Sequence, residues 1–222
     1  MKTWRNLLIC VAVFAVFWIG YDFYLTGAVA TAYKNAVGKL YDSPAKDNGV
    51  ILQQTAVNRN DVLVLGSSEL YATVPQNPKN FFPNRNLPRN IFCVGRAGVL
   101  SLEHTLNIQS LDFSQNQRLV YLVSFAWFTN PSVDSDSFYA NFSKNKFYSY
   151  MTNSDVPRED KLYAASRVSD LIRNRNNTQD LDAWVYAKLC KKLPFAFGGI
   201  QALSYPYLSF QRAILSTRDK AQ

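Results

Sequence analysis

The sequence predicts an α/β protein built on a parallel sheet, with a membrane-spanning helix ahead of it. Two short apolar runs, residues 61–66 and 91–95, each end in a glycine, and residues 119–123 form a third run. Between the second and third runs, residues 101–111 carry apolar side chains at helical spacing. Strands that alternate with helices favour a parallel sheet with right-handed crossovers.

The N-terminus carries the signature of a single-pass anchor. Lys2 and Arg5 precede the uncharged run 7–19, which is somewhat short for a span of about 20 residues. Trp4 and Trp18 bracket the run as interfacial aromatics, and the positive charges lie on its N-terminal side. We therefore expect a cytoplasmic N-terminus, one crossing of the cell membrane, and the bulk of the chain on the extracellular side.

A cleaved signal peptide is the alternative reading of this N-terminus. Ala28, Val29 and Ala30 form an Ala-x-Ala site, but it lies far beyond the apolar run, with Asp22 in between. Both readings export the domain, so we expect no nucleic acid among its partners.

Composition narrows the chemistry further. The formal charge of +8 suits an anionic partner such as a lipid surface or a polyphosphate polymer, although a generic basic surface explains it equally well. Cys93 and Cys190 lack the spacing of a metal knuckle, and the chain has one histidine. We expect neither a zinc site nor a disulfide framework, and no cofactor.

Four segments are expected along the chain. They are an anchor at 1–25, a partly helical juxtamembrane segment at 26–60, an α/β core at 61–135 and a helical segment at 136–222. Within them we expect an Asn- and Pro-rich surface loop at 76–90, helices at 136–152, 157–175 and 178–192, and a weakly indicated strand at 200–208.

The sharpest chemical signal follows the first strand. Gly66, Ser67, Ser68 and Glu69 place a hydroxyl at the carboxyl edge of a parallel sheet, where α/β proteins build their sites. A helix starting there would direct N–H groups towards an anion. The structural alternative is that Ser67 or Ser68 only caps that helix, with Glu69 in its first turn.

This motif resembles the Gly-Ser-Ser-Glu-Leu block of the DltD family, which is related to the SGNH (GDSL-like) esterases. The resemblance implies a three-layer, SGNH-hydrolase-like (flavodoxin-like) sheet with Ser68 as the catalytic nucleophile and Ser67 in the place of the esterases' Asp. Residues 95–98 resemble a second block, whose glycine supplies an oxyanion-hole N–H. The resemblance therefore implies that backbone N–H groups of Ser68 and Gly98 stabilise an oxyanion.

The likeness extends over most of residues 1–175. Residues 124–128 resemble the family's Ser-Pro-Gln-Trp-Phe block, with Phe125 and Ala126 in place of Pro and Gln, which removes a polar contributor. Residues 138–148 and 161–171 also resemble the family.

A serine nucleophile needs a base, which the family supplies from an Asp-x-x-His near the C-terminus. Residues 176–222 contain no histidine, so the resemblance implies a C-terminally incomplete sheet and a chain that is inactive alone. His104 could act as the base only if its helix packs over the strand ends, and otherwise is a core or surface residue. Glu103, next to it on the helix, would face away and could not orient it.

The resemblance implies D-alanyl transfer onto lipoteichoic acid at the outer face of the membrane. Its expected partners are lipoteichoic acid, a membrane-bound O-acyltransferase and a D-alanyl carrier protein. Two alternatives stay open: a noncatalytic membrane scaffold for that acyltransferase or carrier, and another cell-envelope SGNH esterase.

A group of basic and aromatic residues could form a cationic face for a polyphosphate chain. A solvated helical face explains them as well. They are Lys144, Lys146, Arg158, Lys161, Arg167, Arg173 and Arg175, with Tyr148, Tyr150 and Tyr163.

Overall fold

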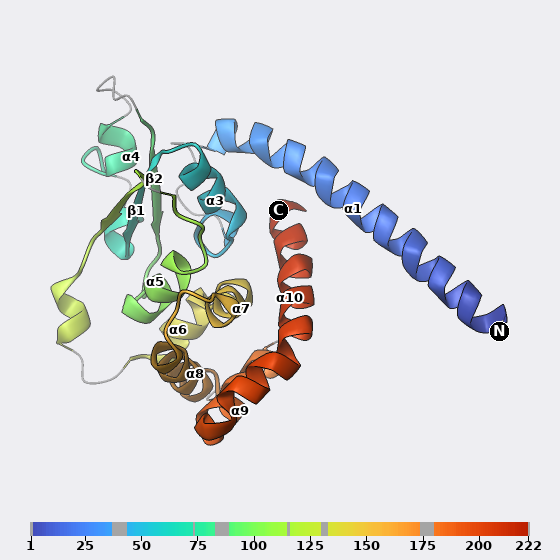
Figure 1. The fold of residues 1–222 in the computed structure, drawn as a ribbon. Coiled ribbons are helices and arrows are strands. Elements are labelled where there is room, and N and C mark those ends of the chain that lie inside the picture. The colour runs from blue at the N-terminus through green and yellow to red at the C-terminus, as the bar shows by residue number, and fades with distance from the viewer. Residues whose placement is uncertain are drawn as a thin grey trace.

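The computed structural model describes residues 2–36, 44–72, 74–82, 89–114, 116–129, 133–173 and 180–221. A long helix, α1 (Lys2–Ala36), projects from an α/β domain (Figure 1). Its segment Trp4–Val29 has a mean hydropathy of 2.0 and its most apolar part is 0% buried. Among the described residues, α1 is the one helix long and apolar enough to cross a membrane.

The C-terminal turns of α1 belong to the domain. Tyr33 is fully buried, its ring stacks on Phe92 with the centroids 5.6 Å apart, and its hydroxyl donates to Asp61 at 2.7 Å. The helix therefore runs without a break across the boundary expected at residue 25. The rest of the expected juxtamembrane segment is also partly helical, with α2 at Pro44–Asp47 and α3 at Ile51–Asn58.

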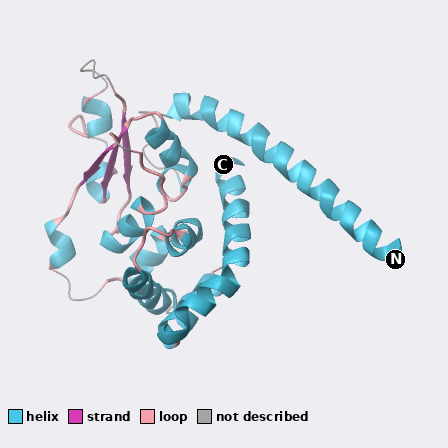
Figure 2. Ribbon diagram, in the orientation of Figure 1, coloured by secondary structure: helices cyan, strands magenta, loops and turns pink. Residues whose placement is uncertain are grey.

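The described sheet has three strands, all parallel as the sequence predicts, in the order β2-β1-β3 (Figure 2). They are β1 (Val62–Gly66), β2 (Ile91–Gly95) and β3 (Arg118–Tyr121). Gly66 pairs with Gly95, so the two glycines that end their strands lie side by side at the carboxyl edge.

Apolar side chains of β1 pack on both faces of the sheet. Leu63 and Leu65 belong to one core cluster, together with Val57 of α3. Val64 packs on the other face with Leu70 and Cys93. This alternation is the period of two expected of a central strand buried on both sides.

Strand β3, predicted at 119–123, is less buried than the other two strands. Leu119 and Val120 are 36% and 43% exposed. Because β3 pairs only with β1 in the described sheet, it is an edge strand with an apolar surface open to solvent.

The helical half confirms most of the predicted helices. Around a second core that includes Phe138, Phe147 and Val168 pack α6 (Ser135–Asn141), α7 (Lys144–Thr152), α8 (Arg158–Arg173), α9 (Leu181–Lys192) and α10 (Phe197–Ala221). The helix expected over 136–152 is divided because the Ser143 side chain caps α7. The ends of the other two predicted helices, 174–175 and 178–179, lie outside the described residues.

Two local predictions were wrong. The strand expected at 200–208 lies inside α10, where both faces of the helix are apolar and the helical period is blurred. The loop expected at 76–90 contains a short helix, α4 (Pro78–Phe81), which Asn77 caps by accepting from the Lys79 N–H. Residues 83–88 of that loop lie outside the described residues.

Candidate functional site

The serine turn lies at the end of β1 and separates two hydroxyls. Ser67 is 7% exposed, and its hydroxyl donates to the backbone carbonyl of Arg96 at 3.3 Å. Ser68 is exposed. Ser67 precedes a 3-10 helix, Ser68–Leu70, without forming a side-chain cap. Ser67 thus holds the turn in place, while Ser68 presents its hydroxyl to solvent.

The helix expected to follow the turn is much shorter than a dipole argument needs. The segment Ser68–Leu70 is a single 3-10 turn. The N-terminus of this segment therefore does not stabilise an anion through a helix dipole, because so short a segment sums few peptide dipoles. Any oxyanion stabilisation has to come from individual backbone N–H groups.

Close contacts around two glycines fix the turn against β2. A Cβ added to Gly95 would lie 2.8 Å from the Ser67 carbonyl oxygen and 2.9 Å from that of Gly66. A Cβ on Gly66 would meet the carboxylate of Glu69, whose Oε1 accepts from the Ser67 N–H at 2.6 Å. Only glycine lets the backbones approach this closely.

The second predicted turn lies at the same edge of the sheet. Gly98 has a φ of 77°, in the left-handed region that glycine adopts without strain. A Cβ there would lie 2.8 Å from Cβ of Ser137 in α6, and Asn141 of α6 donates to the Ala97 carbonyl at 3.0 Å. Helix α6 thus fixes this turn. The joint role of Ser68 and Gly98 at an oxyanion remains a prediction.

His104 does reach the end of β1, where it is buried in an aromatic cluster. Its ring centroid lies 5.1 Å from that of Tyr121 and 5.7 Å from that of Trp127. Burial lowers its pKa to about 4, helped by the charge of Lys146 and opposed by a hydrogen bond with the Gly66 backbone. Its Nε2 has no hydrogen-bond partner among the described residues, so it does not engage Ser68 there.

Glu103, the neighbour of His104 on α5 (Ser101–Ile108), is also buried, at 7% exposed. Burial raises the pKa of its carboxyl to about 7. Both residues line a cavity of about 20 Å³ between α5, α7 and the end of β2. That volume admits about one water molecule, so it is no binding site for a polymer.

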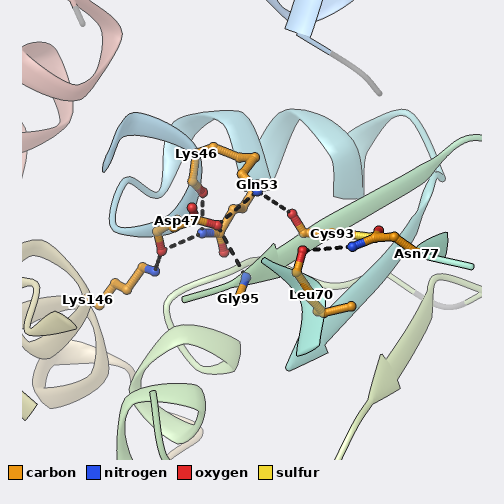
Figure 3. A network of polar contacts seen from close by, with 8 residues as sticks. All are labelled: Lys46, Asp47, Gln53, Leu70, Asn77, Cys93, Gly95 and Lys146. Atoms are coloured by element: carbon orange, nitrogen blue, oxygen red, sulfur yellow. Dashed lines mark hydrogen bonds and ion pairs between the residues drawn. The ribbon is translucent and has the colours of Figure 1, made fainter. Parts of the chain in front are cut away.

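A polar network behind β2 was not anticipated from the sequence (Figure 3). Asp47 accepts from the Gly95 N–H at 3.2 Å and pairs with Lys46 at 3.1 Å. Lys46 also donates to the Cys93 carbonyl at 3.0 Å, and Lys146 donates to the Asp47 carbonyl at 2.7 Å. The network thus joins the segment before α3 to the strand end beneath the serine turn.

Burial dominates the charges of this network. It raises the pKa of Asp47 even though Lys46 pulls it down, and it lowers the pKa of Lys146 to about 7 against the attraction of Asp47 and Asp219. No spacing or motif marks these residues, because Lys46 and Asp47 stand in an ordinary polar stretch of the chain. Only the tertiary fold brings Lys146 to them.

The expected cationic face is wrong for several of its members. Lys146 and Lys161 are 7% and 6% exposed, and Tyr148 is fully buried. Lys144 pairs with Asp180 at 3.5 Å and with Asp182 at 3.3 Å. These side chains build the helical core and its ion pairs rather than a surface for polyphosphate. Arg175 lies outside the described residues.

The fold and this edge define a class of protein: a three-stranded parallel α/β domain that exposes a serine hydroxyl where β1 ends, behind an apolar N-terminal helix. A family model described as DltD protein matches residues 40–222, most of the chain. The chain therefore belongs to the DltD family.

Two relatives agree with this assignment. The chain is 29% identical to Protein DltD of Bacillus subtilis (strain 168) over 128 residues, which are 57% of this chain and 33% of that protein. It is 27% identical to Protein DltD of Staphylococcus aureus (strain NCTC 8325 / PS 47) over 172 residues, 76% of this chain and 43% of that protein. The matches thus span less than half the length of these relatives.

Proposed function

We propose that this protein acts in the D-alanylation of lipoteichoic acid, with Ser68 accepting or passing on the D-alanyl group. The single observation that carries the proposal is the exposed Ser68 hydroxyl at the carboxyl edge of a parallel sheet, in a chain of the DltD family. Its neighbour Ser67 is buried and hydrogen-bonded, so only one of the two hydroxyls is free to meet a substrate.

The chemistry proposed for Ser68 is acyl transfer through an ester on its Oγ. The bond between the D-alanyl carbonyl and its donor group breaks as the Oγ ester forms, and the Ser68 proton leaves with the released donor. In the second step the acceptor hydroxyl takes the acyl group, and its proton returns to Ser68. Negative charge that develops on the carbonyl oxygen needs N–H donors near it, and the backbone at Ser68 and Gly98 is the proposed source. Gly95 supports this arrangement because it lets the serine turn lie directly on the end of β2. The family resemblance further suggests an SGNH-like site.

His104 is a poor candidate for the base in this scheme. A base with a pKa of about 4 accepts a proton weakly near neutral pH, and its Nε2 makes no bond to Ser68 in the described structure. We assign His104 to the support of the strand end, through Gly66, Tyr121 and Trp127.

The same proposal places α1 across the cell membrane, with its N-terminus in the cytoplasm and the domain outside. The uncharged run 7–19 within Trp4–Val29 and the full exposure of its most apolar part support this, since such a surface is not stable in water. In this position the domain meets lipoteichoic acid, a membrane-bound O-acyltransferase and a D-alanyl carrier protein.

A test in cells separates catalysis from a scaffold role. Ser68→Ala and the exposed control Ser154→Ala would each replace the native allele, and D-alanine ester would be measured per teichoic-acid phosphate. Catalysis by Ser68 requires the ester to fall to the level of a strain without the gene in Ser68→Ala and to stay at wild-type level in Ser154→Ala.

An unchanged ester content in Ser68→Ala would support the scaffold instead, because that role needs only the anchor and the protein surface. Release of acetate from cell-wall polymer, lost in Ser68→Ala, would point to another envelope esterase.

A further inference from the structure

A long stretch without charge runs through the first part of α10 and the 3-10 turn Pro194–Ala196 before it, and lies at the protein surface. Residues 193–211 carry no Asp, Glu, Lys or Arg, while Lys191 and Lys192 precede the stretch and Arg212 follows it. Several of its large side chains are exposed: Phe195 at 81%, Leu203 at 87%, Tyr205 at 56%, Tyr207 at 45% and Phe210 at 58%. Apolar patches of this kind on a soluble surface mark interaction sites.

The outer face of α10 is apolar, although the helix also makes polar contacts with the domain. Gln201 points inward and donates to the Met151 carbonyl at 2.7 Å, and Arg212 donates to Thr152 at 2.7 Å. Leu203 and Phe210 point outward. Phe197, Leu208 and Leu215 pack inward on the helical core, so α10 is apolar on both faces. A helix that is apolar on its outer face as well has a second apolar partner besides its own core.

The position of α1 identifies that partner. Leu203, Phe210 and Thr217 recur every seven residues and so share one face of α10. The Thr217 hydroxyl donates to Asp22 of α1 at 2.9 Å, and Lys220 donates to the same carboxylate at 2.7 Å. The apolar face of α10 therefore meets α1 at Asp22, the charged residue that follows the uncharged run of α1.

The directions of α1 and α10 also bring lipid close to the apolar face of α10. From its contact with α1, α10 leads back along the domain, while α1 continues away from it (Figure 1). If α1 crosses a bilayer, the membrane surface lies near Asp22, at the level where the apolar face of α10 meets α1. Lipid next to α1 is then the surface closest to that face.

We infer that α10 lies in the interfacial layer of the bilayer that α1 crosses, with Leu203, Pro206 and Phe210 among the acyl chains. The inference rests on the membrane anchor of the proposed function. Tyr205, 56% exposed, supplies an amphipathic ring suited to the headgroup level. Lys192 is exposed just before the apolar face and offers positive charge for lipid phosphates, whereas Lys191 pairs with Asp170 at 2.6 Å.

The inference is tested with the full chain in vesicles of phosphatidylglycerol and phosphatidylcholine, with and without bromine on the acyl chains. An environment-sensitive fluorophore is attached to Leu203→Cys or to Gln76→Cys, both in a Cys10→Ser background. Gln76 is exposed and lies two residues before α4, a helix that Figure 1 shows far from α10. Cys93 and Cys190 are buried and stay unlabelled in the folded protein.

We expect a blue-shifted probe at position 203 that loses emission about twofold in brominated lipid, as a residue within the acyl boundary does. The probe at position 76 should show neither change. A probe at 203 that behaves like the one at 76 overturns the inference. So does a blue-shifted probe at 203 that bromine does not quench, because a protein partner then covers the face.

Native Cys10, labelled in the otherwise unchanged chain, reports on the anchor separately. It is exposed on α1, within the candidate span. Bromine quenching at Cys10 without quenching at 203 refutes the position of α10 and leaves the anchor standing. Absence of quenching at Cys10 refutes the anchor of the proposed function itself.

Discussion

Two aspartate–lysine pairs in this molecule differ in burial: one is formed by neighbours in sequence that bond to β2, and the other joins the two ends of the described chain. Lys46 and Asp47 are 6% and 2% exposed in their side chains and hold the end of β2 beneath the serine turn. Lys220 and Asp22 are 14% and 35% exposed and join α10 to α1. Burial, more than the N–O distance of 3.1 Å or 2.7 Å, decides what each pair contributes to the free energy of unfolding.

The largest expected effect is at the buried pair. Asp47→Ala leaves the Lys46 ammonium without its counter-ion and the Gly95 N–H without its acceptor. Breaking a buried pair of this kind costs about 3–5 kcal/mol of unfolding free energy. Urea unfolding in detergent micelles measures it, with Asp155→Ala as the exposed control. A loss as small as that of the control would show that the network does not hold the strand end.

The next effect concerns two buried groups on one helix that respond oppositely to pH. Burial lowers the pKa of His104 to about 4, below its unfolded value, so stability present above pH 6.5 is lost as the pH falls towards 4. Burial raises the pKa of Glu103 to about 7, so stability present below pH 4.5 is lost as the pH rises towards 7.

Single variants separate these opposing slopes. In Glu103→Gln, the unfolding free energy should fall by up to about 3 kcal/mol between pH 6.5 and 4, since each pKa unit corresponds to about 1.4 kcal/mol. In His104→Gln it should instead fall as the pH rises from 4.5 to 7. Slopes of the same sign in both variants would contradict these assignments.

A smaller effect is expected at the contact between the two turns. Gly95→Ala pushes a Cβ against the Ser67 and Gly66 carbonyls and should cost about 1–3 kcal/mol. Gly199→Ala, in α10 with no atom within 4 Å of the new Cβ, should stabilise by up to about 1 kcal/mol. Urea unfolding of both variants measures the difference. Equal effects would mean that the serine turn moves away freely.

The smallest effect is expected at the half-exposed pair. Asp22→Asn removes an ion pair with Lys220 that water reaches, so the unfolding free energy should change by less than about 1 kcal/mol. The same urea experiment, repeated in high salt, should show little difference between Asp22→Asn and wild type. A loss comparable to that of Asp47→Ala would mean that this contact is as important as the buried one.

The sequence predicted those parts of the fold that local pattern determines. The three strands, their parallel direction and the long apolar N-terminal helix follow from apolar runs and from the glycines that end two of the strands. The serine turn at 66–69 was predicted because a turn motif after a strand is a local signal, whereas the resemblance to the DltD family singled out Ser68 and Gly98. The structure brings the two turns to one edge.

What the sequence could not predict depends on contacts between distant segments. Lys146 reads as a surface cation on an amphipathic helix, yet it is buried on Asp47, 99 residues away in the chain. The 200–208 segment reads as a weak strand because α10 is apolar on both of its faces. In both cases the surroundings, which no local pattern contains, decide the outcome.

The most direct test of the central claim is the covalent state of Ser68. Membranes from cells that carry this protein would be given radiolabelled D-alanine with its activating enzymes, and the purified protein would be examined for an alkali-labile label. If Ser68 carries the D-alanyl ester, wild type and Ser154→Ala should be labelled and Ser68→Ala should not. Equal label on Ser68→Ala, or labelled teichoic acid with no label on the wild-type protein, would contradict it.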